Sequence, residues 1–237
     1  GIRDAQESRG LGDVYKRQST GDANNFGDLT EFNSASATCA SPTRGIFNQG
    51  SVPTYKKTIE FITIATLGNA TRFGESSKAG AGAPMGASST TRGVFAGGQF
   101  DNPYPQTDII DYITIASEGN GIDFGQNNTG GFGAQGASDS VRAISAGGGY
   151  PSASATIDMF FFSTVGSKTD FGDITATRFR GDRAVCSPVR GIFTGGYGPT
   201  VNTLDTKLLA SSADTTEFGT LANSGRGMTC ICLLYTS

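Results

Sequence analysis

The segment Arg44–Gly50 reads RGIFNQG, and three near-copies of it follow at an almost constant spacing. They are RGVFAGG from Arg92, RAISAGG from Arg142 and RGIFTGG from Arg190, which begin 48, 50 and 48 residues apart. Each copy is a short apolar run closed by glycine, a pattern typical of a β-strand that meets a turn. Recurrence at a fixed period of this length is the sequence signature of a repeat architecture.

Two further elements recur in step with this segment. A Phe-Gly pair returns after 47, 51, 47 and 47 residues, and its aromatic residues are Phe26, Phe73, Phe124, Phe171 and Phe218. A run rich in β-branched and aromatic residues returns as IEFITIA from Ile59, IDYITIA from Ile110, IDMFFFS from Ile157 and LDTKLLA from Leu204. Three elements that share one period indicate tandem structural units of 47 to 51 residues.

Each unit contains four candidate strands. The RGIF and IDYITIA elements give two of them, the residues that lead into Phe-Gly give a third, and those that precede the arginine give a fourth. Four short strands in a unit of this size match one blade of a β-propeller. One blade cannot bury its apolar faces alone, so its neighbours must cover them. The sequence therefore predicts an all-β propeller fragment of about four full units and a partial one.

Both ends of the chain resemble translated sequencing adapter. Asp13–Gln18 reads DVYKRQ and Cys232–Ser237 reads CLLYTS, and both translate one transposon mosaic-end element, in opposite senses. Residues 1–12 fit the adjoining adapter segments in the same frame. Segments of this kind carry no information about the fold. We therefore expect residues 1–18 and 232–237 to be adapter-derived, and residues 19–231 to form one repeat domain that is truncated at both ends.

Composition argues against several classes of function. The chain has 18 Lys and Arg against 21 Asp and Glu, and without the two end segments 14 remain against 18. No basic cluster is present, so no nucleic-acid partner is expected, and no apolar run is long enough for membrane insertion. The sequence has no histidine, which removes Ser-His-Asp and Cys-His catalysis and histidine-bound metals. Cys39, Cys186 and Cys230 lack disulfide or zinc spacing, so we expect no catalytic residues, metal or cofactor.

One arginine occupies the same position in every unit. A ring of arginines is suited to binding anionic groups, but each arginine can instead fix a turn or an acid of a neighbouring unit. Identical placement in all units favours the structural role, with Asp111 and Asp158 as candidate partners. The Phe of each Phe-Gly pair is expected to be a core side chain between units. The arginines concerned are Arg44, Arg92, Arg142 and Arg190.

The loops that follow the glycine pairs differ in length and sequence, whereas the predicted strands repeat. They include QFDNPYPQTD at residues 99–108, YPSAS from residue 150 and YGPTV from residue 197. Variable loops on a rigid scaffold commonly carry binding sites, and aromatic side chains can stack on sugar rings or fill a pocket of a protein partner. Packing within the loops is the alternative. The candidate ligand-binding residues are Phe100, Tyr104, Tyr150 and Tyr197.

Two other patterns have competing interpretations. Residues 131–136 read GFGAQG, which matches G-x-G-x-x-G, but a dinucleotide loop must open a helix and here a strand pattern follows, so an ordinary loop is predicted. GDANNFGD from Gly21 and GNGIDFG from Gly119 are rich in side-chain oxygens that calcium could use. They lack the ligand order of an EF-hand, and Asx turns explain them more simply.

The repeat resembles the kelch family of propellers. The resemblance rests on the glycine pair after a short apolar strand, the acid–aromatic pair Asp111-Tyr112 and the later aromatic Phe124, where kelch repeats usually have Trp. The fuller pattern FGDLT…SPTRGIFxGG…IDYITIAS is similar to tandem repeats in virion or tail proteins of uncultured marine phages.

That resemblance implies a non-catalytic binding or structural module, such as a phage tail or surface adhesin component. Its partners would be a host surface glycan or protein, or other virion proteins, and its location would be the virion or the cell exterior. The alternatives are a carboxylate-dependent glycan-active enzyme and an intracellular protein-interaction scaffold.

Overall fold

The structure, a computed structural model, describes residues 24–31, 34–48, 50, 56–77, 83–99, 108–126, 131–149, 152–178, 184–198 and 200–224. These residues form four four-stranded antiparallel sheets and contain no helix. Within each sheet, strands that follow one another in the chain are hydrogen-bonded neighbours. This is the architecture of β-propeller blades, and it confirms the predicted all-β propeller of four-stranded units.

The strands of the four blades have the following bounds. Blade 1 contains β1 (Ala37–Ala40), β2 (Arg44–Asn48), β3 (Thr58–Thr63) and β4 (Thr71–Glu75). Blade 2 contains β5 (Met85–Ser88), β6 (Arg92–Ala96), β7 (Ile109–Thr114) and β8 (Ile122–Gln126). Blade 3 contains β9 (Gln135–Ser138), β10 (Arg142–Ala146), β11 (Ser154–Phe161) and β12 (Thr169–Arg178). Blade 4 contains β13 (Val185–Cys186), β14 (Arg190–Thr194), β15 (Thr203–Leu208) and β16 (Thr216–Thr220).

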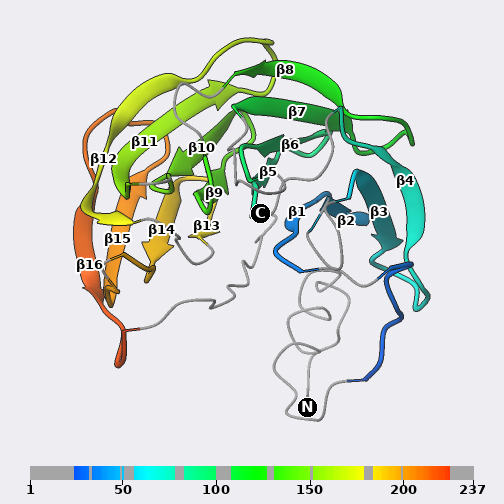
Figure 1. The fold of residues 1–237 in the computed structure, drawn as a ribbon, viewed down its shortest axis with the longest axis horizontal. Coiled ribbons are helices and arrows are strands. Elements are labelled where there is room, and N and C mark those ends of the chain that lie inside the picture. The colour runs from blue at the N-terminus through cyan, green and yellow to red at the C-terminus, as the bar shows by residue number, and fades with distance from the viewer. Residues whose placement is uncertain are drawn as a thin grey trace, which may run out of the picture.

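The four blades follow one another around an arc, with blade 1 and blade 4 at its two ends (Figure 1). The first strand of every blade lies on the inside of the arc, and the fourth strand forms its outer edge. The RGIF element is thus the second strand of each blade, and the Phe-Gly pair lies on the outer strand.

The hydrophobic core lies between blades. Each of three buried clusters joins two successive blades, and the Phe of the earlier blade's Phe-Gly pair belongs to each: Phe73, Phe124 and Phe171. At the first boundary Phe73 packs edge-on against Phe61, with ring centroids 6.0 Å apart. Burial at such a boundary contributes about 25 cal/mol per Å² of apolar surface. Stacking of neighbouring units therefore supplies the stability that one blade lacks.

The glycine of the Phe-Gly pair is required by the contact between blades. A Cβ atom on Gly74 would overlap the main-chain carbonyl of Gly119 in the next blade, and a Cβ on Gly125 would overlap that of Gly166. Only a residue without a side chain lets the outer strand approach the next blade so closely. The Phe side chain therefore fills the space between two blades, and the adjacent glycine allows their main chains to approach closely.

The inner strands also touch one another through the main chain. A Cβ on Gly86 would overlap the carbonyl of Thr38 in the preceding blade, and one on Gly136 would overlap that of Gly86. Ser88 donates from Oγ to the carbonyl of Ala40 at 2.8 Å, and Ser138 donates to that of Ser88 at 2.9 Å. The inside of the arc is therefore packed strand against strand.

Residues Asn24–Asp28 continue the repeat before blade 1. The carbonyl of Phe26 accepts from the amide of Gly68, and that of Asp28 accepts from the amide of Ala70. Phe73 and Glu75 make the same pair of bonds to Gly119 and Gly121 in blade 2. Residues 24–28 thus take the place of an outer strand in front of blade 1, which agrees with the predicted partial unit.

Candidate functional site

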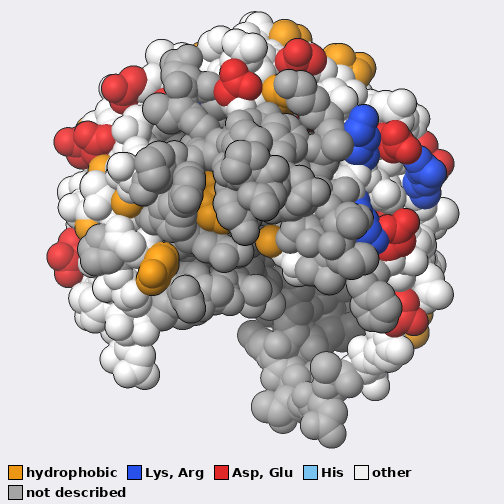
Figure 2. Space-filling view, viewed as in Figure 1, with side chains coloured by type: hydrophobic (Ala, Val, Ile, Leu, Met, Phe, Trp, Pro, Cys, Tyr) orange, Lys and Arg blue, Asp and Glu red, His pale blue; other side chains and the backbone are white. Residues whose placement is uncertain are grey.

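The two edges of the blades differ in character. The connections between second and third strands, and those from one blade to the next, leave from one face of the arc, which we call the loop face. The hairpins that join first to second and third to fourth strands lie on the opposite turn face. The strands that the predicted ligand-binding loops connect end at the loop face, and Figure 2 views the molecule from this side.

Tyr197 is the candidate ligand-binding residue that the structure describes. Strand β14 ends at Thr194, and Gly195 and Gly196 then turn the chain outward with φ of 49° and 127°, values that glycine adopts readily. The amide of Val201 donates to the carbonyl of Gly196 at 3.3 Å and so closes the loop. Tyr197 is 43 % exposed, so part of its surface faces solvent.

The loop that holds Tyr197 is fixed to the outer strand of its own blade. Asn202 donates from Nδ2 to the carbonyl of Leu221 at 3.3 Å, and the amide of Leu221 donates back to the carbonyl of Asn202 at 2.7 Å. The loop is thus braced at its base. The other three candidates, Phe100, Tyr104 and Tyr150, lie outside the described residues, as do both predicted adapter segments.

The repeated arginines lie on the turn face and join one blade to the next. Arg44 donates from a guanidinium nitrogen to the carbonyl of Ile115 at 3.0 Å, and Arg142 donates to that of Leu209 at 3.1 Å. Arg92 donates to the carbonyl of Phe162 in the same way. Arg190 belongs to blade 4, and no blade follows it in the described part of the chain. Its side chain therefore has no equivalent carbonyl there, and Arg190 is exposed.

Each of these arginines also closes a hairpin. In SPTR, STTR and SPVR the serine accepts from the arginine amide through Oγ, at 3.0 to 3.1 Å, and in DSVR Asp139 accepts instead. Such side-chain turns favour tight connections. The guanidinium of Arg44 lies 4.5 Å from the Phe61 ring and that of Arg92 lies 4.4 Å from the Tyr112 ring, distances at which a cation is attracted to the ring face.

The acids suggested as arginine partners have other roles. Asp111 accepts hydrogen bonds from the amide and the hydroxyl of Ser77 in the preceding blade, and Asp158 forms an ion pair with Lys168. The prediction that Asp111 and Asp158 bind the arginines was therefore wrong. A main-chain carbonyl satisfies the guanidinium at the boundary between blades, and no side-chain pattern can reveal that acceptor.

A buried acid at the second position of the IDYITIA element links successive blades. The Asp111 carboxylate accepts a hydrogen bond from the amide of Ser77. In the same way Glu60 accepts from the amide of Thr30 at 3.2 Å, and Asp205 accepts from the hydroxyl of Thr175. The donors all lie four residues after the Phe of a Phe-Gly pair. The recurring hydroxyl in FGDLT, FGESS and FGDIT was the signal that could have identified this contact.

Burial shifts the pKa values of two acids and one lysine in the blades. Desolvation raises the pKa of Glu60 and that of Asp158, although Lys168 opposes the shift at Asp158. Desolvation lowers the pKa of Lys207. The Lys207 ammonium donates to the carbonyl of Phe171 at 2.8 Å and lies 4.6 Å from its ring. Lys207 therefore joins blade 4 to blade 3 and Glu60 joins blade 1 to the segment before it, whereas Asp158 and Lys168 pair within blade 3.

Sequence reasoning missed a buried polar cluster between blades 3 and 4. Arg178 and Asp205 are fully buried and form an ion pair, and Gln135 accepts from Arg178 at 3.4 Å. Gln135 in turn donates to the carbonyl of Thr194. Arg178 stands where its repeat counterpart is Gly80, so no periodic signal marked it. Removal of one partner of such a buried pair leaves an uncompensated charge, which is strongly destabilising.

The five Phe-Gly aromatics differ in burial. Phe73, Phe124 and Phe171 are buried at boundaries between blades, Phe26 is half-buried and Phe218 is 56 % exposed. A blade follows each of the first four of these rings in the described part of the chain, but Phe26 lies on a segment that pairs with no strand, and no described blade follows Phe218. Position in the arc, rather than the motif, therefore sets the burial of each ring.

The remaining motifs have structural explanations. Gly131–Gly136 leads into strand β9 rather than a helix, so it lacks the helix N-terminus that a dinucleotide loop needs. Asn25, Asp123 and Asp170 each accept from the amide two residues later, at 2.9 to 3.0 Å, as in Asx turns. Within the described ranges, no group of three or more acidic or cysteine residues is placed to hold a metal ion.

No protein-family model matches the chain, and no curated protein matches it. In the part of the chain that the structure describes, no helix is long and apolar enough to cross a membrane.

Proposed function

We propose that this chain is a non-catalytic, kelch-like propeller module of a phage tail or surface adhesin that binds a host glycan or protein through its loop face. The observation that carries the proposal is the exposure of Tyr197 on a braced loop of that face. A half-exposed aromatic ring held by a rigid scaffold can stack on a sugar or fill a partner's pocket at little entropic cost.

The distribution of acids supports a non-catalytic role. Glu60, Asp111, Asp158 and Asp205, the buried acid of each blade, all accept bonds that hold the structure together. Acidic side chains are spread around the rim in Figure 2, and the few basic ones visible there lie beside them. Such mixed charge suits a glycan or protein partner better than nucleic acid, which requires a basic surface.

An array of bacterial surface glycans, together with pull-down from host envelope extracts, tests this proposal. We expect saturable binding that Tyr197→Ala weakens about tenfold, the effect of losing roughly 1.4 kcal/mol. Phe161→Ala is the matched control, because Phe161 is 41 % exposed but ends strand β11 on the turn face. Absence of binding to both glycans and envelope proteins, or equal losses for the two variants, would count against the loop face.

A further inference from the structure

Blade 1 exposes a face that is buried in the other blades. Ile64 is 46 % exposed, whereas Ile115 and Phe162, at the same repeat position in blades 2 and 3, are covered by the preceding blade. Phe47 is half-buried, whereas its counterpart Phe95 is buried. Blade 1 therefore has the side chains of a boundary, and no blade precedes it among the described residues.

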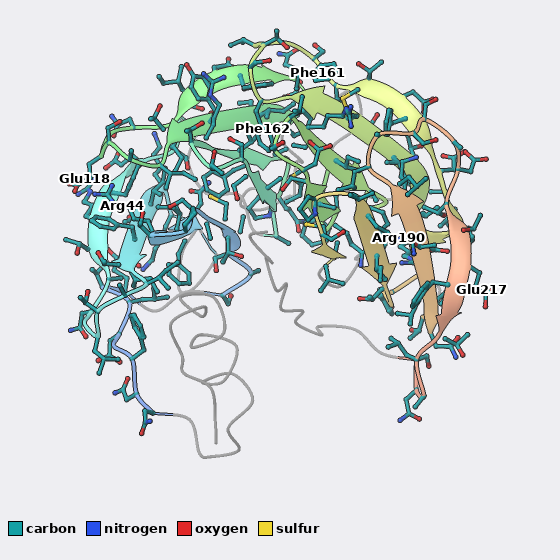
Figure 3. All side chains as sticks on the ribbon, turned by 180° about the vertical axis from the view of Figure 1, so that it is seen from behind. Arg44, Glu118, Phe161, Phe162, Arg190 and Glu217 are labelled. Carbon is teal, nitrogen blue, oxygen red and sulfur yellow. The ribbon has the colours of Figure 1, made fainter. Side chains whose placement is uncertain are left out.

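Blade 4 exposes the opposite side of the same kind of boundary. Phe218 is 56 % exposed, whereas Phe124 at its position is fully buried. Ile192 is half-buried, whereas its counterpart Val94 is fully buried. Arg190 is exposed and lies at the far end of the arc from Arg44, as Figure 3 shows. Blade 4 thus exposes the side chains that the earlier blade supplies at an internal boundary, and blade 1 exposes those that the later blade supplies.

We infer that the open face of blade 4 binds the open face of blade 1 in a second copy of this chain. The occupant is argued from the three boundaries inside the molecule, where the same two faces already pack together. In the contact between copies, Phe218 is covered as Phe124 is, and Arg190 donates to the carbonyl of Ile64 as Arg44 donates to that of Ile115. Two different faces meet, so the association is head to tail.

One segment competes for this contact. Residues 24–28 (NNFGD) occupy the outer-strand position in front of blade 1, which strand β16 (TEFGT) of the second copy must take. Strand β16 is hydrogen-bonded to β15 and brings a whole blade with it, whereas residues 24–28 pair with no strand among the described residues. The incoming blade brings Phe218 and Ile192 to the boundary, where the segment brings Phe26, so we expect the blade to displace the segment.

The predicted competition gives two equivalent phenylalanines opposite effects. Phe218→Asp removes an apolar side chain from the docking face, so we expect association at least about tenfold weaker. Phe26→Ala weakens the competing segment, so we expect association stronger than in the unchanged chain. Val165→Asp is the control, because Val165 is exposed on a turn away from both open faces, and it should leave association unchanged.

Light scattering after size-exclusion chromatography, over a hundredfold range of concentration, measures this association. We expect masses that rise in whole multiples of the chain, with circular dichroism showing that every variant is folded. A mixture of Phe218→Asp with Ile64→Asp should form only a dimer, because each variant keeps one of the two faces. A chain that stays monomeric throughout, a loss caused equally by Val165→Asp, or higher multiples in the mixture would overturn the inference.

Discussion

A guanidinium nitrogen of Arg44 lies 3.0 Å from the carbonyl oxygen of Ile115 and donates a hydrogen bond to it across the boundary between blades 1 and 2. Arg142 repeats this bond to Leu209 between blades 3 and 4. A hydrogen bond with one charged partner contributes roughly 1.5 to 3 kcal/mol. The repeated arginines therefore stabilise the contacts between neighbouring blades through hydrogen bonds.

Removal of one internal arginine should destabilise the molecule more than removal of the terminal one. We expect Arg142→Ala to lower the free energy of unfolding by about 1.5 to 3 kcal/mol, and Arg190→Ala to change it by less than about 0.5 kcal/mol, as for a surface substitution. Urea titration of dilute protein measures both values. Equal effects would show that the bond between blades is not what Arg142 contributes.

Two glycines on opposite sides of one contact should respond differently to alanine. Gly74→Ala places a Cβ against the carbonyl of Gly119, so we expect a loss of about 1 to 3 kcal/mol from overpacking. Gly119→Ala places its Cβ in open space, and we expect a change within about 0.5 kcal/mol. Thermal unfolding of both variants tests the pair, and a tolerated Gly74→Ala would contradict the close approach of the blades.

Removal of Lys168 should leave a costly unpaired carboxylate. Lys168→Ala is expected to lower stability at neutral pH by about 3 to 5 kcal/mol, because Asp158 then has a buried charge without its partner. Replacement of both residues, as Asp158→Leu with Lys168→Met, should recover most of the loss. A double variant as unstable as Lys168→Ala would show that packing, not the charge, is at fault.

The same pair predicts a dependence on pH. Burial raises the pKa of Asp158 above its usual 3.8, so the folded protein holds this proton more tightly than the unfolded chain. The contribution of Asp158 to stability therefore falls as pH rises past 3.8. Lys168 opposes the shift, so Lys168→Ala should be destabilised less at pH 4 than at pH 7. Unfolding free energies at the two pH values measure the difference, and a loss independent of pH would contradict it.

The sequence predicted the blades because their strand elements recur at one period. The RGIF, IDYITIA and Phe-Gly elements each became a strand of the expected kind, since the same packing problem is solved four times. The sequence did not predict which rings are buried, because Phe124 and Phe218 have the same motif and differ only in their place along the arc.

The contacts between blades were harder to predict than the strands. The acceptor of Arg44 is a main-chain carbonyl, which any residue could supply. The partner of Asp111 is a serine 34 residues earlier in the chain, a separation that only the stacking of blades explains. For the candidate binding site, the sequence proposed Tyr197 but could show neither its exposure nor the bonds from Asn202 that brace its loop.

Unfolding of Phe124→Ala beside Phe218→Ala tests most directly whether packing between successive blades holds this protein together. We expect Phe124→Ala to cost about 3 to 5 kcal/mol, the usual result of removing a large core side chain, and Phe218→Ala to cost less than about 1 kcal/mol in dilute, monomeric protein. Similar losses for the two variants, or a loss below about 1 kcal/mol for Phe124→Ala, would contradict a core built between blades.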